Sequence, residues 1–595
     1  MRARSALAWL AAVAATGAGD ASLFVPSGTV DLCLSFEQSE AFLRAAAARY
    51  PNVTRLFVAG KSLQKNAMSV LCVGKACVLD DASLAARTPG AFLNAMHHSR
   101  ECLSMMALHY GLQAVLAGYE RGDAWALHLV SSRRMLFWPI VNPDGYLWNE
   151  INKPQGDGMQ RKNRRPGCKH GRADDVGVDL NRNYPTCFEQ VDDGASSDPC
   201  GEDYKGPAPF SEPETQAVRA LVERSNFSVA LNIHSYGRLM LLPYSCKPLG
   251  HPTGADDTFY LRLARELAAA NNFTVGRSWE PEVGLYTVDG DAADWMYREH
   301  HIFALSPEVG GPGFWPTRNN PDEAVHLSVE NVPMLLHAAW ASGPLLRLER
   351  ASLQWVKLDG TEGEQDDNLT ISIDLVNAGL RGSQGEATLL VRAGTDGPQP
   401  NASGSDVLRA QSAGVLPGQY GSATLQAQVR FSDAWDGITL AATDLGSCVV
   451  YRIGALNVRR AAGKPDPLLL DLNNTVYTER HDSCWTGETR PPAPPPTEMP
   501  DMEMGNDMGQ GAALRVAAAV GAAALLVPLL LGGLCWVERK RRSRYAEVDR
   551  LELTRMRSAS GGNDARIAHA GDLDFAEDEE DEDQEVLAPM QVQVI

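Results

Sequence analysis

The chain has 595 residues, a length that accommodates about three to four domains of ordinary size. Its formal net charge is −20, from 54 Lys and Arg against 74 Asp and Glu, which argues against a general affinity for nucleic acid or anionic lipid. With 44% hydrophobic residues and 12 Trp, the composition excludes a collagen-like, repeat-only or wholly disordered chain.

The N-terminus has the pattern of a secretory signal. Arg2 and Arg4 precede an apolar run over residues 6–15, and small residues follow as far as Gly19. We expect a signal peptide over residues 1–18; the alternative is an N-terminal core helix. A secreted chain would form disulfides in an oxidising compartment.

Residues 33–345 alternate between strand-like apolar runs and amphipathic helical runs, which predicts one α/β domain around a mostly buried sheet. The candidate strands cover residues 56–59, 68–73, 134–141, 228–234 and 302–306. The candidate helices cover residues 102–116, 212–224, 257–270 and 322–341.

The pattern changes over residues 348–460 to short alternating strands with no helical period, which predicts a β-sandwich domain. Its candidate strands include residues 369–376, 387–391 and 424–431. We expect a linker and juxtamembrane stalk over residues 461–515, because its last part is rich in Pro, Met and acidic residues.

Residues 516–537 form a run of 22 residues without a charge, enough for a helix of about 33 Å that crosses a bilayer. Basic residues follow at 539–544 and acidic residues precede it, so the positive-inside rule predicts a single-pass type I protein in contact with membrane lipid. The alternative is a buried soluble helix. If the chain is a type I membrane protein, its catalytic domain would be extracellular or luminal, at the plasma membrane or in the secretory and endosomal pathway. The tail, residues 538–595, is expected to be cytoplasmic and disordered, and ten acids lie within residues 572–585.

Cysteines and glycosylation sequons agree with that topology. Cys535 lies inside the predicted membrane segment, and the other ten of the eleven cysteines lie on the predicted luminal side, an even number compatible with disulfides. Candidate pairings are Cys168 with Cys187 or Cys200, and Cys448 with Cys484. Six N-x-Ser/Thr sequons precede residue 516, at Asn52, Asn226, Asn272, Asn368, Asn401 and Asn473.

His98 and Glu101 stand three residues apart at the start of a candidate helix, so both side chains can face one metal ion. Such a pair alone is a weak signal, because many helix surfaces contain one. Here it is accompanied by further polar motifs at residues 161–164, 177–183, 232–236, 286, 294–295 and 307–308.

This set resembles the zinc metallocarboxypeptidase family of the carboxypeptidase A/B and N/E types, over residues 33–345. The resemblance implies a mixed-sheet α/β catalytic domain with one Zn²⁺, acting on peptides or proteins with a free C-terminal carboxylate. It implies that the metal ligands are His98, Glu101 and His234. For the other positions it implies Glu308 as general base, Arg164 as the group that polarises the scissile carbonyl, and a set of substrate-binding residues: Arg100, Asn181, Arg182, Tyr286, Ala293 and Ser245.

The chemistry of these residue types is consistent with that resemblance. Two imidazoles and one carboxylate leave a fourth position on Zn²⁺ for water, as in catalytic sites. A carboxylate such as Glu308 can accept and return a proton, and Arg182 offers a bidentate fork to a terminal carboxylate. Cys102 is expected to be a buried apolar residue, because a thiolate ligand would fill the open position. His97, His300 and His301 are expected to be structural.

Some features depart from the family or leave alternatives open. The short stretch between residue 18 and residue 33 predicts no long inhibitory prosegment, and the β-domain after the catalytic domain is similar to the N/E type. Ala293 and Ser245 lack the acidic side chain that a Lys/Arg-specific enzyme would carry, which favours an apolar or broad preference, although Asp289 and Asp291 lie near. A catalytically silent peptide-binding or adhesion ectodomain is the alternative to an enzyme.

Overall fold

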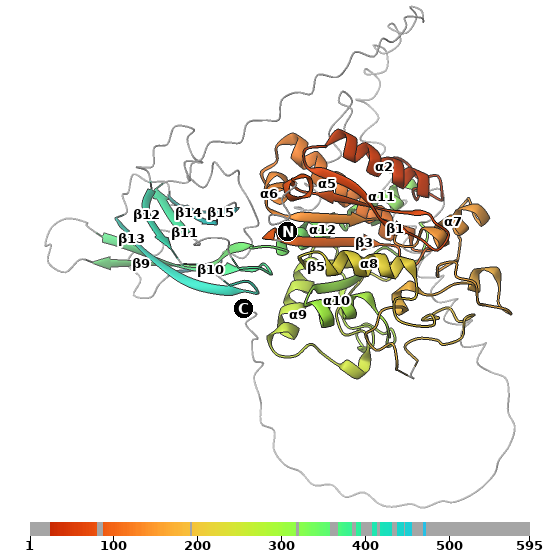
Figure 1. Cartoon of the computed structure of the whole chain (residues 1–595). Helices are drawn as coiled ribbons and strands as arrows, with labels where there is room; N and C mark the ends of the chain where they lie inside the picture. The colour runs from red at the N-terminus through yellow and green to blue at the C-terminus, as the bar shows by residue number, and fades with distance from the viewer. Residues whose placement is uncertain are drawn as a thin grey trace, which may run out of the picture. The chain divides into compact units, whose positions relative to one another are not determined.

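The computed structural model describes twelve stretches of the chain, coloured in Figure 1. They are residues 24–79, 87–190, 193–316, 320–357, 367–382, 388–393, 407–412, 414, 417–430, 437–444, 447–454 and 468–471. The predicted signal peptide, the membrane segment, the tail and the stalk from residue 472 onward lie outside these stretches, as does Cys484. Within them, no helix has both the length and the apolar composition that crossing a membrane requires.

A mixed eight-stranded sheet forms the centre of the N-terminal domain, in the order β1-β2-β4-β3-β5-β8-β6-β7. The inner strands β4, β3, β5 and β8 run parallel, whereas β1 with β2, β2 with β4, and β6 with β8 are antiparallel. The strands are β1 (Thr54–Lys61), β2 (Ala67–Val73), β3 (Gly90–Ala95), β4 (Arg134–Trp138), β5 (Phe227–Ile233), β6 (Leu239–Leu241), β7 (Thr274–Gly276) and β8 (Phe303–Glu308). The predicted α/β class with a mixed sheet is confirmed.

Helices cover both faces of this sheet (Figure 1). Helices α2, α5 and α12 contribute to one buried hydrophobic cluster and α8 and α10 to another. The helices are α2 (Phe36–Arg49), α3 (Lys75–Val78), α5 (Cys102–Arg121), α6 (Ala124–Ser132), α7 (Pro143–Asn152), α8 (Pro213–Glu223), α9 (Ala255–Leu267), α10 (Ala292–His300), α11 (Pro321–Val329) and α12 (Val332–Ala341). Because both faces are covered, the inner strands are buried along their length.

Prolines explain two differences from the predicted elements. The strand predicted over residues 134–141 ends at Trp138, because Pro139 has no N–H to donate to the sheet. The helix predicted over residues 322–341 is two helices, and Pro333 lies in the first turn of the second, where a missing N–H costs little. Strand β3 was not predicted, since its six residues are too few to show a periodicity that separates a buried strand from a loop.

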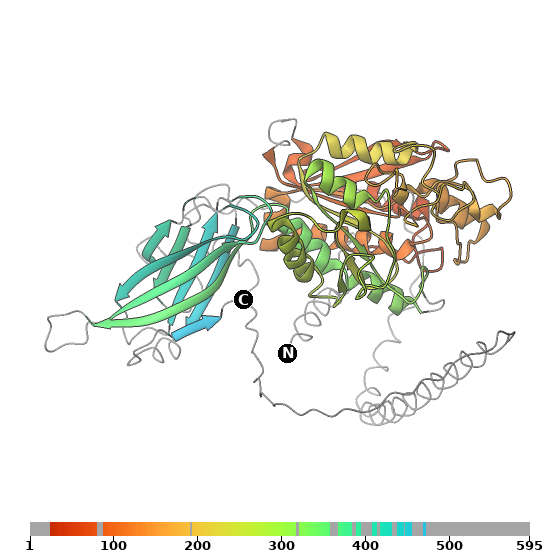
Figure 2. The same ribbon diagram turned by 90° about the horizontal axis from the view of Figure 1, so that it is seen from below.

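The described residues from 346 to 471 form strands without a helix, in two four-stranded antiparallel sheets (Figure 2). One sheet has the order β13-β10-β9-β16 and the other β12-β11-β14-β15. The strands are β9 (Leu346–Lys357), β10 (Asp367–Asn377), β11 (Thr388–Ala393), β12 (Val407–Ser412), β13 (Gly421–Arg430), β14 (Gly437–Asp444), β15 (Ser447–Gly454) and β16 (Leu468–Asp471). Buried Leu369, Ile371, Ile373 and Leu375 alternate with partly exposed residues along β10, as a half-covered strand requires. β16 lies beyond residue 460, the predicted end of the β-sandwich.

Glu214 on α8 has a fully buried carboxylate, which is not part of the candidate active site described below. One oxygen accepts a hydrogen bond from the Leu63 amide at 2.9 Å, and the other accepts one from the Asn163 side chain at 3.2 Å. Burial raises the pKa of Glu214 from 4.5 to about 7. Between these two values the folded protein keeps a proton that the unfolded chain releases, so raising the pH favours unfolding.

We expect Glu214→Gln to remove this part of the pH dependence of stability. From pH 4.5 to pH 8, the free energy of unfolding of the wild type should fall by about 3 kcal/mol more than that of the variant. Urea denaturation across this pH range measures the difference. Glu223→Gln, at an exposed position on the same helix, should follow the wild type. Equal pH slopes for wild type and Glu214→Gln would contradict a raised pKa.

Candidate active site

Three neighbouring parallel strands place the predicted site residues at one edge of the sheet. His98 follows β3, His234 follows β5, and Glu308 ends β8. The backbones of His234 and Glu308 form a bridge, in which the His234 amide donates to the Pro307 carbonyl at 2.9 Å. The carboxyl ends of parallel strands are where α/β domains bind ligands, so this edge is the candidate active site.

His98, Glu101 and His234 converge at this edge and are all buried. A ring nitrogen of His98 lies 2.8 Å from one Glu101 oxygen, and a ring nitrogen of His234 lies 3.0 Å from the other. The same two ring nitrogens lie 3.1 Å apart. Burial lowers the pKa of His98, so its imidazole is neutral and able to ligate a cation. Two imidazoles and a carboxylate aimed at one point fit Zn²⁺ with a position left open.

Asp179 contacts His98 at the ring nitrogen that does not face Glu101. One carboxylate oxygen lies 3.1 Å from the second ring nitrogen of His98, and the other accepts a hydrogen bond from Arg161 at 2.8 Å. A carboxylate on the far nitrogen fixes the orientation of a ligating imidazole. Asp179 was not among the predicted site residues, although it stands two residues before Asn181 in the same motif.

The structure brings Arg161, and not Arg164, to the cluster. The Arg161 guanidinium is buried and lies 3.8 Å from a Glu101 oxygen. Arg164 instead stacks on Trp148, with its guanidinium carbon 3.7 Å from the ring centre, and donates to the Gln160 side chain and the Ala173 carbonyl. These three contacts of Arg164 lie outside the cluster, and its predicted role stays a prediction.

Glu308 lies at the end of β8 beside the ligand cluster and is not one of its three members. Burial, and then the charge of Glu101, raise the pKa of Glu308 to about 8, while His234 and Arg161 act in the opposite direction. A carboxylate held in this way is a stronger base than an exposed one, which suits it to accept a proton near neutral pH.

Asn181 and Arg182 lie on a short helical turn and are buried. The Arg182 guanidinium donates to the carbonyls of Gly194 at 3.1 Å and Asn181 at 3.0 Å. The Asn181 side chain donates to Asp291 at 2.9 Å. Tyr286 is 55% exposed, and its ring centre lies 5.9 Å from the Arg182 guanidinium carbon. The structure thus places the buried Arg182 guanidinium near an exposed tyrosine ring, and the substrate-binding roles of these residues stay predictions.

Ser245 and Ala293 meet around Asp294. The two oxygens of buried Asp294 accept hydrogen bonds from the backbone amides of Ser245 at 2.9 Å and Cys246 at 3.0 Å. Burial raises the pKa of Asp294 well above its usual range. Asp294 therefore fixes the loop of Ser245 against the start of α10, where Ala293 is buried.

Arg100 precedes Glu101 in the chain and packs against Phe314. Its guanidinium carbon is 4.1 Å from the Phe314 ring centre, and it pairs with Glu202 at 2.5 Å. Tyr236, next but one to His234, meets the same ring edge-on with centres 5.0 Å apart. Arg100 thus already has an aromatic and an acidic partner, and its substrate-binding role stays a prediction.

Eight cysteines of the described residues form four disulfides, as an even number of luminal cysteines allows. Cys168 pairs with Cys200, one of the two predicted alternatives. The other described disulfides are Cys33–Cys102, Cys72–Cys77 and Cys187–Cys246. Cys102 is therefore a disulfide cysteine, and the prediction of a buried apolar residue was wrong about its chemistry, because its partner is 69 residues away in sequence. It is not a metal ligand.

The remaining histidines have other contacts. His97 is buried, and one of its ring nitrogens lies 2.8 Å from the Tyr184 hydroxyl. His300 packs edge-on against Trp295, and His301 is exposed at the end of α10. None of the three belongs to the cluster of His98, Glu101 and His234.

Comparison with known proteins identifies relatives of the N-terminal domain. Residues 39–328 match the family model described as zinc carboxypeptidase. A metallocarboxypeptidase A-like protein of Trichophyton verrucosum is 30% identical over 226 residues, which cover 36% of this chain and 48% of that protein. Carboxypeptidase B of Homo sapiens is 26% identical over 283 residues, which cover 47% of this chain and 63% of that protein.

A solved structure gives a similar match. The crystal structure of carboxypeptidase A from Helicoverpa armigera aligns with a TM-score of 0.44 at 24% identity, covering 57% of this chain and 80% of that chain. The matched region spans between 48% and 64% of the length of the curated relatives cited and of rat carboxypeptidase B.

Proposed function

Because residues 39–328 belong to the zinc carboxypeptidase family, we propose that the protein is a zinc-dependent metallocarboxypeptidase that hydrolyses the C-terminal peptide bond of peptides and proteins. The observation that carries this proposal is the convergence of His98, Glu101 and His234, with Glu308 beside them but outside the ligand set. Its cofactor is Zn²⁺, one per catalytic domain.

In the proposed mechanism, the metal, the residues that orient its ligands and the base Glu308 have separate roles. When bound, Zn²⁺ supplies Lewis acidity, which makes a water a better nucleophile and a carbonyl a better electrophile. Asp179 orients His98, and Arg161 restrains Asp179 through its hydrogen bond of 2.8 Å. Glu308 accepts the proton of the attacking water and returns it to the nitrogen of the leaving residue.

We assign stabilisation of the developing oxyanion to Arg161, in place of Arg164. Its guanidinium lies within 4 Å of a Glu101 oxygen, so it also reaches the region where the scissile carbonyl would lie. A fixed cation there stabilises negative charge that appears only in the transition state.

Recognition of the free C-terminus is proposed for Asn181, Arg182 and Tyr286. Hydrogen bonds to two carbonyls hold the Arg182 guanidinium in place, so the fork can meet a carboxylate without further ordering. The exposed ring of Tyr286 is available to cover the bound carboxylate. Arg100 would contact residues upstream of the scissile bond.

An apolar or broad side-chain preference is proposed for the terminal residue. Ala293 and Ser245 are uncharged, and the nearby Asp294 already accepts one backbone amide at each oxygen. No strong counter-charge from these three residues is therefore offered to a Lys or Arg side chain.

Anchoring to a membrane as a type I protein, with the catalytic domain extracellular or luminal, is part of this proposal. It rests on the uncharged run at residues 516–537, the basic residues after it, and the signal-like N-terminus. The four disulfides of the described region fit an oxidising compartment.

A panel of peptides with varied C-terminal residues tests the activity. Purified zinc-loaded full-length protein should release single C-terminal residues, and 1,10-phenanthroline should stop the release until Zn²⁺ is restored. Peptides with an amidated C-terminus should resist, because Arg182 would lack a carboxylate partner. Failure of zinc-replete protein to release any residue would favour a silent peptide-binding ectodomain.

A further inference from the structure

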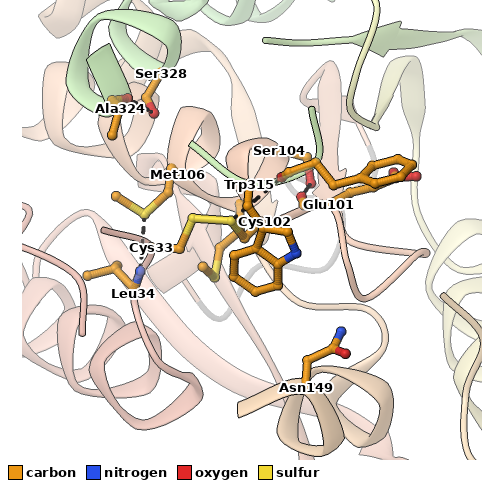
Figure 3. Close-up of a disulfide and its surroundings, with 12 residues drawn as sticks. Cys33, Leu34, Glu101, Cys102, Ser104, Met106, Asn149, Trp315, Ala324 and Ser328 are labelled. Atoms are coloured by element: carbon orange, nitrogen blue, oxygen red, sulfur yellow. Dashed lines mark hydrogen bonds between the residues drawn. A yellow bond between two sulfur atoms is a disulfide. The ribbon is translucent and has the colours of Figure 1, made fainter. Parts of the chain in front are cut away.

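The disulfide between Cys33 and Cys102 joins the N-terminal segment to the first residue of α5 (Figure 3). Its Cα atoms lie 6.1 Å apart, and 69 residues separate the two cysteines in sequence. Both are fully buried. Cys102 directly follows Glu101, so the disulfide constrains the backbone next to a residue of the ligand cluster.

The N-terminal segment that carries Cys33 is itself fastened to the domain. The Val25 amide donates to the Gln113 side chain at 3.2 Å, and the Tyr146 hydroxyl donates to the Leu34 carbonyl at 2.6 Å. Val25 and Leu34 are buried. These contacts are with α5 and α7, so hydrogen bonds as well as the disulfide hold the segment around Cys33 against the domain.

Cys102 also contacts the loop that follows Glu308. Its sulfur lies 3.9 Å from the Phe314 carbonyl oxygen. Figure 3 shows Trp315 of this loop beside Cys102, with Leu34 on the Cys33 side of the disulfide. The Trp315 indole donates to the Gly158 carbonyl at 2.9 Å. The disulfide therefore lies between the ligand Glu101 and the loop that leaves the base Glu308.

The backbone of Glu101 depends on its neighbours for its position. Its φ of −99° and ψ of 54° are not helical, and its side chain does not cap α5. The Ser104 hydroxyl donates to the Glu101 carbonyl at 2.6 Å. The carboxylate itself contacts His98, His234, the Ser235 amide and, at 3.8 Å, the Arg161 guanidinium, which all lie at the site. Fixing Cys102 thus limits the movement of Glu101 from outside the site.

We propose that the Cys33–Cys102 disulfide is a positioning element of the metal site, which holds Glu101 in place and so slows the loss of Zn²⁺. The inference rests on the zinc site of the proposed function. Opening the disulfide leaves all three ligands present but loosens the one carboxylate. Changes in the groups that orient metal ligands cost about 10–100-fold in metal affinity.

The test compares two double variants of the full-length protein, Cys33→Ser/Cys102→Ser and Cys187→Ser/Cys246→Ser. The control pair closes a loop of similar length, with a sequence separation of 59 against 69, and lies next to Ser245 instead of a ligand. Loss of either disulfide therefore gives a similar increase in unfolded-state freedom. The rate of zinc transfer to a chromogenic chelator is measured, together with the unfolding midpoint of the metal-free proteins.

We expect Cys33→Ser/Cys102→Ser to release zinc about 10–100-fold faster than wild type, and the control pair to release it within about twofold of wild type. Similar zinc release rates for both double variants, whether fast or slow, would overturn the proposal, since the tie at Cys102 would then have no special effect on the ligand. These readouts need no peptidase activity, so they are independent of whether the protein hydrolyses peptides.

A second measurement uses wild-type protein and therefore tests the proposal even if the double variant folds poorly. Wild-type, zinc-loaded protein is treated with a phosphine reductant, and the reduced cysteines are alkylated and identified by mass spectrometry. Zinc release should follow the alkylation of Cys33 and Cys102 and not that of Cys187 and Cys246. Retention of zinc after complete alkylation of Cys33 and Cys102 would contradict a positioning role.

Discussion

Glu308→Gln is expected to lower kcat by about 10²–10⁴-fold while the protein keeps its zinc. The amide has nearly the shape of the carboxylate but cannot accept a proton from water. Glu308 lies beside the cluster of His98, Glu101 and His234 without belonging to it, so its replacement removes no ligand. The measurement is kcat on the best peptide of the panel, together with zinc content.

Stability gives an independent readout of the same substitution. Burial and the charge of Glu101 raise the pKa of Glu308 to about 8, so its ionised form is unfavourable in the folded metal-free protein. The metal-free variant should therefore unfold at no lower temperature than wild type. Glu282→Gln, at an exposed loop position, should leave kcat unchanged. Wild-type kcat for zinc-loaded Glu308→Gln would exclude Glu308 as the base.

The ligand set could be predicted from the sequence because each ligand lies beside a regular element. His98 and Glu101 lie between a strand and a helix, and His234 directly follows an apolar strand, so short motifs place them. The sheet then brings the strand ends together, which the family resemblance implied. Long-range links carry no such local signal: the partner of Cys102 lies 69 residues away, and Asp179 meets His98 across 81 residues.

The segment of residues 161–164 shows where the sequence was not sufficient. It has no regular secondary structure, so no periodicity tells which of its basic side chains faces inward. The structure separates them by their partners, since Arg161 contacts Asp179 and Glu101 whereas Arg164 stacks on Trp148. Charge alone did not distinguish the two arginines, but burial beside two carboxylates does.

Arg161→Ala is accordingly expected to lower kcat by about 10²–10³-fold, the usual loss when one oxyanion-stabilising donor is removed. Arg164→Ala, three residues away in the same segment, should stay within a few-fold of wild type, because it loses only a ring contact and two hydrogen bonds outside the cluster. Steady-state kinetics on one peptide measure both variants. KM should change less than kcat for Arg161→Ala, since the oxyanion charge develops only in the transition state.

Arg161→Lys separates the charge of this residue from its hydrogen-bonding geometry. Lysine keeps the positive charge but lacks the planar fork with which Arg161 holds Asp179 and approaches Glu101. We therefore expect kcat for Arg161→Lys to lie between those of wild type and Arg161→Ala. The reverse ranking, with Arg164→Ala more damaging than Arg161→Ala, would return the oxyanion role to Arg164, and its stack on Trp148 would then have to open during turnover.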